Sequence, residues 1–397
     1  MTFRLPDSAV FTMYALPLFF LPLSTAGAGI SAGLFLLTYA ASGYWRRWRE
    51  IPKRPWALPL ALLIALTFLG LLWTRDMHFG FKVAAATSYG IYAFMGATLP
   101  WRERWLRWLI RLFLYGLLIN AVLACLITWR ILHWHYDPTM PYVGLAGHIW
   151  LSMALTHALL WILWDLRTGW NFGLWPNLAL GTLFFAELAL SPGRSGQLLF
   201  VLLMPAAVWL LFQGRWRYWA MGAIAVTVVA LSFSPIVQSR VTLGMENLQQ
   251  FIHNPASTDT SWGIRLATMW AGLKMAEEHP LLGVGTGDFA PAMADLQARH
   301  EVTATPGTGN DSAANNYLSE AAVLGLPGLA LLIWFLVTLS RESWRARMTP
   351  QGWFVLGYLG IFWIGGLYNT LTWGYGDAFT IALLAGLPLM RPADIAP

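Results

Sequence analysis

The sequence predicts an all-α, polytopic integral membrane protein with about twelve transmembrane helices, and three observations lead to that class. Of its 397 residues, 57% are hydrophobic and only 11% are charged, whereas an ordinary soluble domain is roughly 25% charged. The apolar runs are long enough for membrane helices rather than barrel strands. The 24 tryptophans agree, because indole favours the membrane interface. This composition excludes a soluble enzyme, a disordered protein and a secreted disulfide scaffold.

The predicted spans follow one another with short connections, except at one place. Windows of about 19 residues locate them, and some are short or contain Pro or Gly. The spans lie near residues 8–25, 27–44, 56–73, 80–99, 105–129, 147–164, 171–190, 197–213, 217–236, 317–340, 352–370 and 376–391.

Lys and Arg are divided unequally between the two sides of these spans. If the N-terminus is cytoplasmic, sixteen of the 25 fall in cytoplasmic loops or tails, eight fall outside, and Arg111 lies within a span. Cytoplasmic loops carry the excess of Lys and Arg, so we predict that both termini are cytoplasmic. The net charge of +6 is then a topology signal, and no nucleic-acid partner is predicted.

One long connection divides the chain into three regions. Residues 1–236 hold the first nine spans, residues 237–316 form a large outer loop, and residues 317–397 hold the last three spans. A long loop in a compact bundle is usually functional. Residues 264–278 carry apolar side chains at helical spacing, which predicts an amphipathic helix against the outer mouth of the bundle. Its apolar stripe comprises Leu266, Met269, Trp270, Ala271, Leu273 and Ala276.

Neither the cysteine nor the histidines predict a metal site. Cys125 is the single cysteine, so an intrachain disulfide is excluded and a small buried side chain is the expected role. His133, His135 and Asp137 lie close together in sequence, but residues two apart do not face the same way on a helix. We therefore predict no metal and no cofactor.

The first motif that carries chemistry spans residues 191–197, Ser-Pro-Gly-Arg-Ser-Gly-Gln. Pro and Gly end one helix, and the next helix begins with exposed N–H groups, so Arg194 stands at a helix start that favours anions. Arg also binds phosphate oxygens with a planar fork. An interfacial Arg that reaches lipid headgroups is an equally open interpretation.

Two further cations lie on the predicted outer side. Arg265 stands near the start of the loop helix, where it opposes the helix dipole, so a role as an anion ligand is favoured over helix stabilisation. Lys82 lies at the outer end of the fourth span. By itself it is typical of a lysine that reaches the interface, although it can complete a cationic cluster.

A glycine-rich motif covers residues 279–289, His-Pro-Leu-Leu-Gly-Val-Gly-Thr-Gly-Asp-Phe. It lacks the Gly-Lys-Ser/Thr ending and the preceding strand of a nucleotide-binding loop. A helix end followed by tight turns is the expected structure, with His279 as a helix C-cap residue.

A third motif, Asn315-Asn316-Tyr317-Leu318-Ser319-Glu320, opens the tenth span. Amides and a carboxylate at this depth are costly unless they are solvated or paired. They can orient a sugar hydroxyl, and they can equally cap the helix. Asp377, at the outer end of the last span, has the same two interpretations.

The order of these motifs resembles the O-antigen ligase (WaaL-type) superfamily, which also includes O-antigen polymerases and bacterial protein O-oligosaccharyltransferases. The resemblance extends to the whole topology, and its specific part is residues 191–328. The hallmark of the family reads His-Asn-x-Tyr-Leu, and residues 314–318 stand in its place.

This resemblance implies a GT-C-like glycosyltransferase of the bacterial inner membrane that acts in lipopolysaccharide biosynthesis, with an active site facing the periplasm. The implied reaction transfers O-antigen from undecaprenyl diphosphate to a sugar hydroxyl of lipid A–core, with inversion and without metal. Arg194 and Arg265, with Lys82 in a lesser role, are the implied diphosphate ligands. The remaining implied site residues are Asn315 and Tyr317 near the chemistry, and Asn316, Glu320 and Asp377 on the acceptor side.

One position departs from the hallmark. The family histidine, expected to act as a base or to orient the acceptor, falls at Ala314, and the chain reads Ser312-Ala313-Ala314-Asn315 there. We expect either an inactive variant, engineered or natural, or a protein whose base lies elsewhere, with His300 and His279 as the alternatives.

Two other functions stay open. Within the superfamily, a polymerase and a protein O-oligosaccharyltransferase have overlapping motifs. In another class, a lipid-linked glycan transporter would place charges along a path through the membrane. The charges within spans are few, chiefly Arg111, Asp165 and Glu187, and no internal repeat is evident, so an enzyme is favoured.

Overall fold

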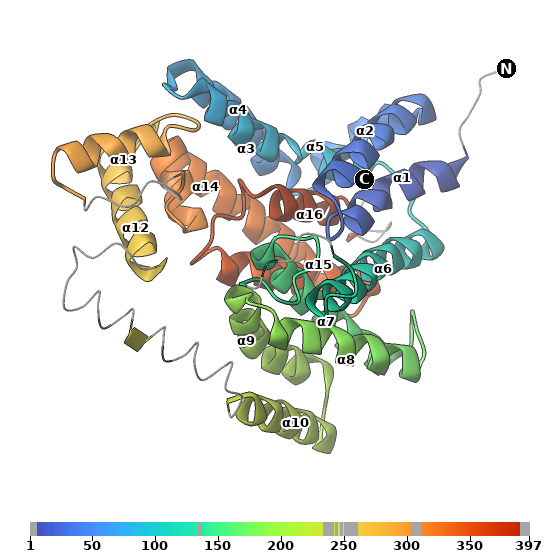
Figure 1. The fold of residues 1–397 in the computed structure, drawn as a ribbon. Coiled ribbons are helices and arrows are strands. Elements are labelled where there is room, and N and C mark those ends of the chain that lie inside the picture. The colour runs from blue at the N-terminus through green and yellow to red at the C-terminus, as the bar shows by residue number, and fades with distance from the viewer. Residues whose placement is uncertain are drawn as a thin grey trace.

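The structure is a computed structural model that describes residues 6–133, 137, 139–232, 242, 245, 246, 249, 261–302 and 311–389. Arg4, His135, residues 390–397 and parts of the outer loop lie outside the described residues. The described chain forms helices joined by turns, without a strand, and this confirms the all-α class (Figure 1).

The helices follow the predicted apolar segments closely. The N-terminal part contains α1 (Asp7–Phe20), α2 (Thr25–Ser42), η1 (Tyr44–Lys53), α3 (Ala57–Leu69), η2 (Gly70–Trp73), α4 (Met77–Ser88), α5 (Ile91–Ala97) and α6 (Glu103–Thr128). The middle part contains α7 (His148–Thr168), α8 (Leu174–Leu190), α9 (Arg194–Leu211) and α10 (Arg215–Ser232). The remaining helices are α12 (Ser261–Glu278), α13 (Phe289–Ala298), α14 (Asn316–Arg345), α15 (Pro350–Gly365) and α16 (Tyr375–Ala385).

Fewer helices than predicted are long enough to span a bilayer alone. Among the described residues, five helices have the length and apolar character, and a sixth span results if the bent pair η1 and α3–η2 counts as one. A span needs about 20 residues, whereas α1 has 14, and the predicted segment 80–99 is divided between α4 and α5. The chain is therefore a helical protein with several membrane spans, and the count of twelve stays a prediction.

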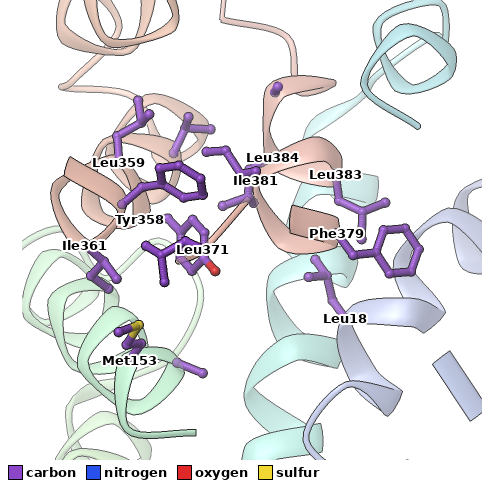
Figure 2. Close-up of a cluster of buried hydrophobic side chains, with 14 of the residues drawn as sticks. Leu18, Met153, Tyr358, Leu359, Ile361, Leu371, Phe379, Ile381, Leu383 and Leu384 are labelled. Carbon is purple, nitrogen blue, oxygen red and sulfur yellow. The ribbon is translucent and has the colours of Figure 1, made fainter. Parts of the chain in front are cut away.

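The core lies where α15 and α16 meet the helices around them. In Figure 2, Tyr358 of α15 and Met153 of α7 lie on one side, and Phe379 of α16 lies near Leu18 of α1 on the other. Each of these side chains is at most 1% exposed. The packing fixes the loop between α15 and α16, which carries the polar residues described below.

The helix pair α7 and α9 approaches unusually closely at the Gly-Arg-Ser-Gly motif. A Cβ atom added to Gly196 would stand 2.1 Å from the Ser152 carbonyl oxygen, and one at Gly193 would stand 2.3 Å from the Ser152 Cβ. These glycines let the start of α9 rest on α7. They therefore hold Arg194, the first residue of α9, at a fixed place.

The predicted loop helix exists as α12, but its buried face was predicted only in part, since Ala271 is buried as expected. It begins at Ser261 rather than at Ile264. The face that is buried carries small residues and one methionine: Gly263, Ala267, Thr268, Ala271, Gly272 and Met275. By contrast, Trp270 and Leu273 of the predicted stripe are 50% and 37% exposed. The reason is close packing against α14 and its preceding segment, since a Cβ at Gly272 would lie 2.8 Å from the Ala313 Cβ.

The glycine-rich motif forms the predicted turns and joins three parts of the fold. The amides of Val284 and Gly285 donate to the Ala322 and Val323 carbonyls of α14. The Thr286 hydroxyl donates to the carbonyl of Thr67 in α3, at 2.7 Å. Gly287 adopts φ +93°, and a Cβ there would stand 2.3 Å from the Gly80 nitrogen of α4. The loop therefore links α12 to α14, α3 and α4.

Asp288 completes this junction. Its carboxylate is buried and accepts hydrogen bonds from the Thr74 hydroxyl and from the amides of Arg75 and Asp76, at 2.7–2.8 Å. These donors belong to the turn between η2 and α4. The outer helices α12 and α13 are thus anchored to the turn that precedes α4.

Removal of this carboxylate should destabilise the protein strongly. We expect Asp288→Ala to lower the free energy of unfolding by on the order of 3 kcal/mol, because buried amides lose a charged acceptor. The measurement is thermal unfolding in detergent. Asp295→Ala is the control, since Asp295 is an exposed member of a nearby ion pair and should cost less than about 1 kcal/mol. Equal losses in both variants would contradict the anchoring role.

Candidate functional site

The start of α14 presents the third motif as a polar cluster. The Asn315 side chain accepts hydrogen bonds from the amides of Tyr317 and Leu318 and so caps the helix. This confirms the capping interpretation for Asn315. The Tyr317 hydroxyl donates to the Trp363 carbonyl at 2.8 Å, and the two rings stack. Tyr317 therefore packs α14 against α15 rather than facing open space.

Asn316 and Glu320 lie one turn apart on α14 and meet the segment that connects α15 to α16. The Asn316 amide oxygen accepts from the backbone amides of Leu371 and Thr372 at 3.0 and 2.9 Å. The Glu320 carboxylate accepts from the Thr372 hydroxyl at 2.6 Å and the Trp373 indole at 3.1 Å. Both side chains are buried, and together they fix the position of this connecting segment.

Arg265 projects from α12 toward the same segment. Its guanidinium donates to the Tyr368 carbonyl and lies 3.4 Å from the Asn369 amide oxygen. The residue is half-buried, and this burial lowers the pKa of its guanidinium. Among the described residues, no carboxylate lies within salt-bridge distance of Arg265. A partly desolvated cation without an acidic partner is suited to bind an anion.

The connecting segment also links Arg265 to the Gly-Arg-Ser-Gly motif. The Asn369 amide donates to the Ser195 hydroxyl at 3.2 Å, and the Tyr368 hydroxyl donates to the Ser195 carbonyl at 3.1 Å. Arg194, the next residue along, is exposed at the first turn of α9. The connecting segment thus contacts both Arg265 and Ser195, the residue after Arg194, whereas Arg194 itself does not line the pocket around Arg265.

An open pocket with about 890 Å³ of empty space lies beside this segment. Three predicted site residues that are far apart in sequence, Arg265, Ala314 and Asp377, line it together. The Asp377 carboxylate is buried and accepts a hydrogen bond from the Tyr358 hydroxyl at 2.9 Å. The other lining residues are Ile149, Ile264, Thr268, Ser312, Asn369, Thr370 and Leu371.

The backbone at Ala314 has a conformation that alanine rarely adopts. Its φ is 49°, in the left-handed region. Residues other than glycine rarely adopt this conformation, and Asn, Asp and His are enriched among those that do. A histidine is therefore sterically suited to position 314, and its side chain would begin at the wall of the pocket.

Other predicted residues do not line this pocket. Lys82 is exposed on α4, with its ammonium 5.9 Å from the centre of the Phe79 ring. His279 directly follows α12, as a C-cap residue would, and lines a different cleft. His300 follows α13 with φ 59°. The pocket thus favours position 314 over these two histidines as the place of a base.

The sequence interpretation missed the segment that organises the site. Tyr368, Asn369, Thr370 and Thr372 all bond to predicted site residues or to their neighbours. The signal available in the sequence was that these polar residues form a cluster between two apolar spans. His148 at the start of α7 was missed as well, and it lies within electrostatic range of Arg265.

A second, mostly apolar cavity lies on the other side of the connecting segment. Thr87, Glu320 and Thr372 are the polar residues in its wall. Its apolar lining comes from α3, α4, α14, α15 and α16 and includes Leu63, Leu332, Phe335, Phe362 and Ile381. Since Thr372 directly follows Leu371 of the open pocket, the polar and apolar spaces border the same short stretch of chain.

No cluster of three or more His, Cys, Asp or Glu side chains suited to a metal ion occurs within the described ranges. The absence of a metal requirement stays a prediction.

The fold and the pocket define a helical protein with several candidate membrane spans and a polar pocket around a half-buried arginine, for which the described residues supply no acidic partner. A family model described as O-Antigen ligase matches residues 178–333, and this match supports the predicted resemblance to the O-antigen ligase/polymerase superfamily. The match covers Arg194, Arg265, the glycine-rich motif and residues 314–320. Members of this family are glycosyltransferase-like enzymes, ligases or polymerases, that act on lipid-linked polysaccharides in membranes. No curated protein matches the chain.

Proposed function

We propose that the protein is an O-antigen ligase that transfers O-antigen polysaccharide from undecaprenyl diphosphate to a sugar hydroxyl of lipid A–core. One observation carries the proposal: Arg265, half-buried and without an acidic partner in the described part of the chain, lines one pocket together with position 314 and Asp377. This arrangement offers a cation for a leaving diphosphate, a place for a base, and a carboxylate that can orient a hydroxyl.

The first chemical task is to stabilise the leaving group. As the anomeric C–O bond breaks, negative charge develops on the diphosphate oxygens. Arg265 is held by the Tyr368 carbonyl and Asn369, so its orientation is set before the reaction, and its remaining N–H groups can donate to the diphosphate. Arg194 is the second proposed ligand, and Lys82 is a lesser one.

The second task is to activate the acceptor. A histidine at position 314 would accept the proton of the acceptor hydroxyl as its oxygen attacks the anomeric carbon. Attack opposite the leaving diphosphate inverts the anomeric configuration. Asp377, Asn316 and Glu320 belong to the proposed acceptor side. Because Asn316 and Glu320 already bond to Thr372 and its neighbours, they act there by holding the connecting segment.

The donor lipid and the membrane set the surroundings of this reaction. We propose that the undecaprenyl tail lies between the apolar helices. We further propose that residues 237–316 form a periplasmic loop domain between regions 1–236 and 317–397. Both termini would then be cytoplasmic, in the bacterial inner membrane.

The charges inside the helices favour this proposal over transport. Arg111 donates to Asn171, and Asp165 accepts from the Asn171 and Phe172 amides. Arg111 and Asp165 therefore share Asn171 as a partner, and Glu187 accepts a hydrogen bond from Asn120 at 3.1 Å. Each charge has a local hydrogen-bond partner, which does not favour a transport path.

Acceptor choice distinguishes a ligase from its relatives in the superfamily. The purified Ala314→His variant is given undecaprenyl diphosphate-linked O-antigen with lipid A–core, with lipid-linked repeat units, or with a pilin-like protein. We expect glycan transfer to lipid A–core alone. Elongation of the lipid-linked units would identify a polymerase, and modification of the protein would identify a protein O-oligosaccharyltransferase.

A further inference from the structure

A second cleft, separate from the pocket around Arg265, lies between the outer helices and the turn before α4. It holds about 760 Å³ of empty space. Trp73 and Arg75 of the turn form one wall, and the end of α12 together with α13 forms the other. The Asp288 junction fixes the turn to the outer helices, so the walls are held in place without a ligand.

The cleft combines an apolar interior with two ion pairs at its rim. Arg75 and Asp295 are joined at 2.7 Å, and Arg299 and Glu278 at 2.9 Å. All four side chains are partly accessible, from 34% for Glu278 to 59% for Asp295. The apolar lining consists of Trp73, Met275, Gly283, Val284, Ala292 and Leu296.

This pattern fits one class of ligand. Arg75 and Arg299 each also lie near a second carboxylate, Asp288 at 3.6 Å and Glu301 at 3.3 Å. The arginines are therefore neutralised and do not favour an anion, and the charged rim disfavours a lipid tail. A sugar hydroxyl both donates and accepts hydrogen bonds, so it can bond to a carboxylate and a guanidinium of the same pair. The C–H face of a sugar ring can pack on an aromatic side chain such as Trp73. A neutral, polyhydroxylated chain therefore matches the cleft.

The position of the cleft relates it to the proposed reaction. Arg265 lies in the second turn of α12, whereas Glu278 is its last residue. At 1.5 Å per residue these positions are about 20 Å apart along the helix. A sugar in the cleft is thus not the reacting sugar, but a unit further along the same glycan chain.

We propose that this cleft, formed by Trp73, Arg75, Glu278, Asp295 and Arg299, is a glycan-binding subsite that holds sugar units of the polysaccharide remote from the reacting bond. The inference rests on the proposed function for the origin of the glycan. The binding itself is tested without catalysis, so the two can fail independently.

The test is equilibrium binding by calorimetry, with the full-length protein in detergent. The probe is polysaccharide released by mild acid from lipopolysaccharide of the bacterium that encodes the chain. We expect Asp295→Asn and Arg299→Gln to weaken binding on the order of tenfold each, because each removes hydrogen bonds to a charged group. Glu103→Gln with Arg107→Gln is the matched control. It removes a comparable surface ion pair on α6 and should leave binding unchanged.

A second measurement uses the unmodified chain and so does not depend on the folding of any variant. Carbodiimide labelling of Glu278 and Asp295 should fall when the polysaccharide is added, while labelling of Glu103 should not. In the Ala314→His background, glycan binding that is retained in Arg265→Ala while transfer is lost would separate the subsite from the reaction centre. Unchanged labelling, or equal binding by Asp295→Asn and the unmodified chain, would overturn the proposal and leave the ion pairs as structural contacts only.

Discussion

The Ala314→His variant should transfer glycan roughly 100- to 10,000-fold faster than the chain with alanine, the range that a positioned general base contributes. Position 314 lies at the wall of the pocket that also holds Arg265 and Asp377. Its left-handed φ of 49° is a conformation that histidine adopts more readily than alanine. The new imidazole would therefore enter the pocket without a rearrangement of the backbone. The initial rate of glycan transfer to lipid A–core measures the effect.

Two control variants test whether the gain in transfer rate requires a histidine at position 314 and whether it requires proton transfer. Ala313→His changes the neighbouring residue, which is fully buried, and should not activate the protein. Ala314→Gln places a polar side chain of similar reach at the site but cannot accept a proton near neutral pH, so it should remain slow. If the alanine protein transfers as fast as the Ala314→His variant, the base lies elsewhere, and His148 beside Arg265 becomes the first residue to test.

Loss of Arg265 is the second large effect. In the Ala314→His background, Arg265→Ala should lower the turnover rate by about 100- to 1000-fold, the usual cost of removing one preorganised donor to a developing anion. Arg265→Lys should recover only part of this loss, because an ammonium keeps the charge but lacks the planar fork that fits two phosphate oxygens. Single-turnover kinetics with the lipid-linked donor separates this effect from donor binding.

The matched control for Arg265 is an arginine of the same charge that lies outside the pocket. Arg46 is exposed on η1, and Arg46→Ala should leave the turnover rate unchanged. A similar loss in both variants would mean that net charge, rather than the position of Arg265, governs the rate.

The sequence predicted individual residues of the pocket, but it did not predict the residues that hold them in place. Arg265, position 314 and Asp377 were identified from residue type, motif order and topology, and they do line one pocket. The residues that hold them, Tyr368 and Asn369, were not identified. Their role comes from hydrogen bonds to α9 and α12 across long sequence separations, which no local pattern encodes.

The orientation of α12 shows a second limit of sequence patterns. Helical periodicity placed Trp270 and Leu273 on the buried face because large apolar side chains usually seek a core. The close contact between Gly272 and Ala313 reverses this preference, because only small residues allow the backbones to approach so closely. The glycine-rich motif was correctly predicted as turns, but its junction with α3, α4 and α14 depends on tertiary contacts that the motif alone does not reveal.

Binding of undecaprenyl diphosphate to the unmodified chain tests the central claim, that the pocket around Arg265 is a diphosphate site. With alanine at position 314 the protein lacks the proposed base, so donor-type lipids can be studied without turnover. The experiment compares undecaprenyl diphosphate with undecaprenol, which has the same tail, for protein reconstituted in nanodiscs. We predict that the diphosphate lipid binds more tightly, and that Arg265→Ala removes most of this difference while Arg46→Ala does not. Equal binding of the two lipids, or an unchanged difference in Arg265→Ala, would contradict the account.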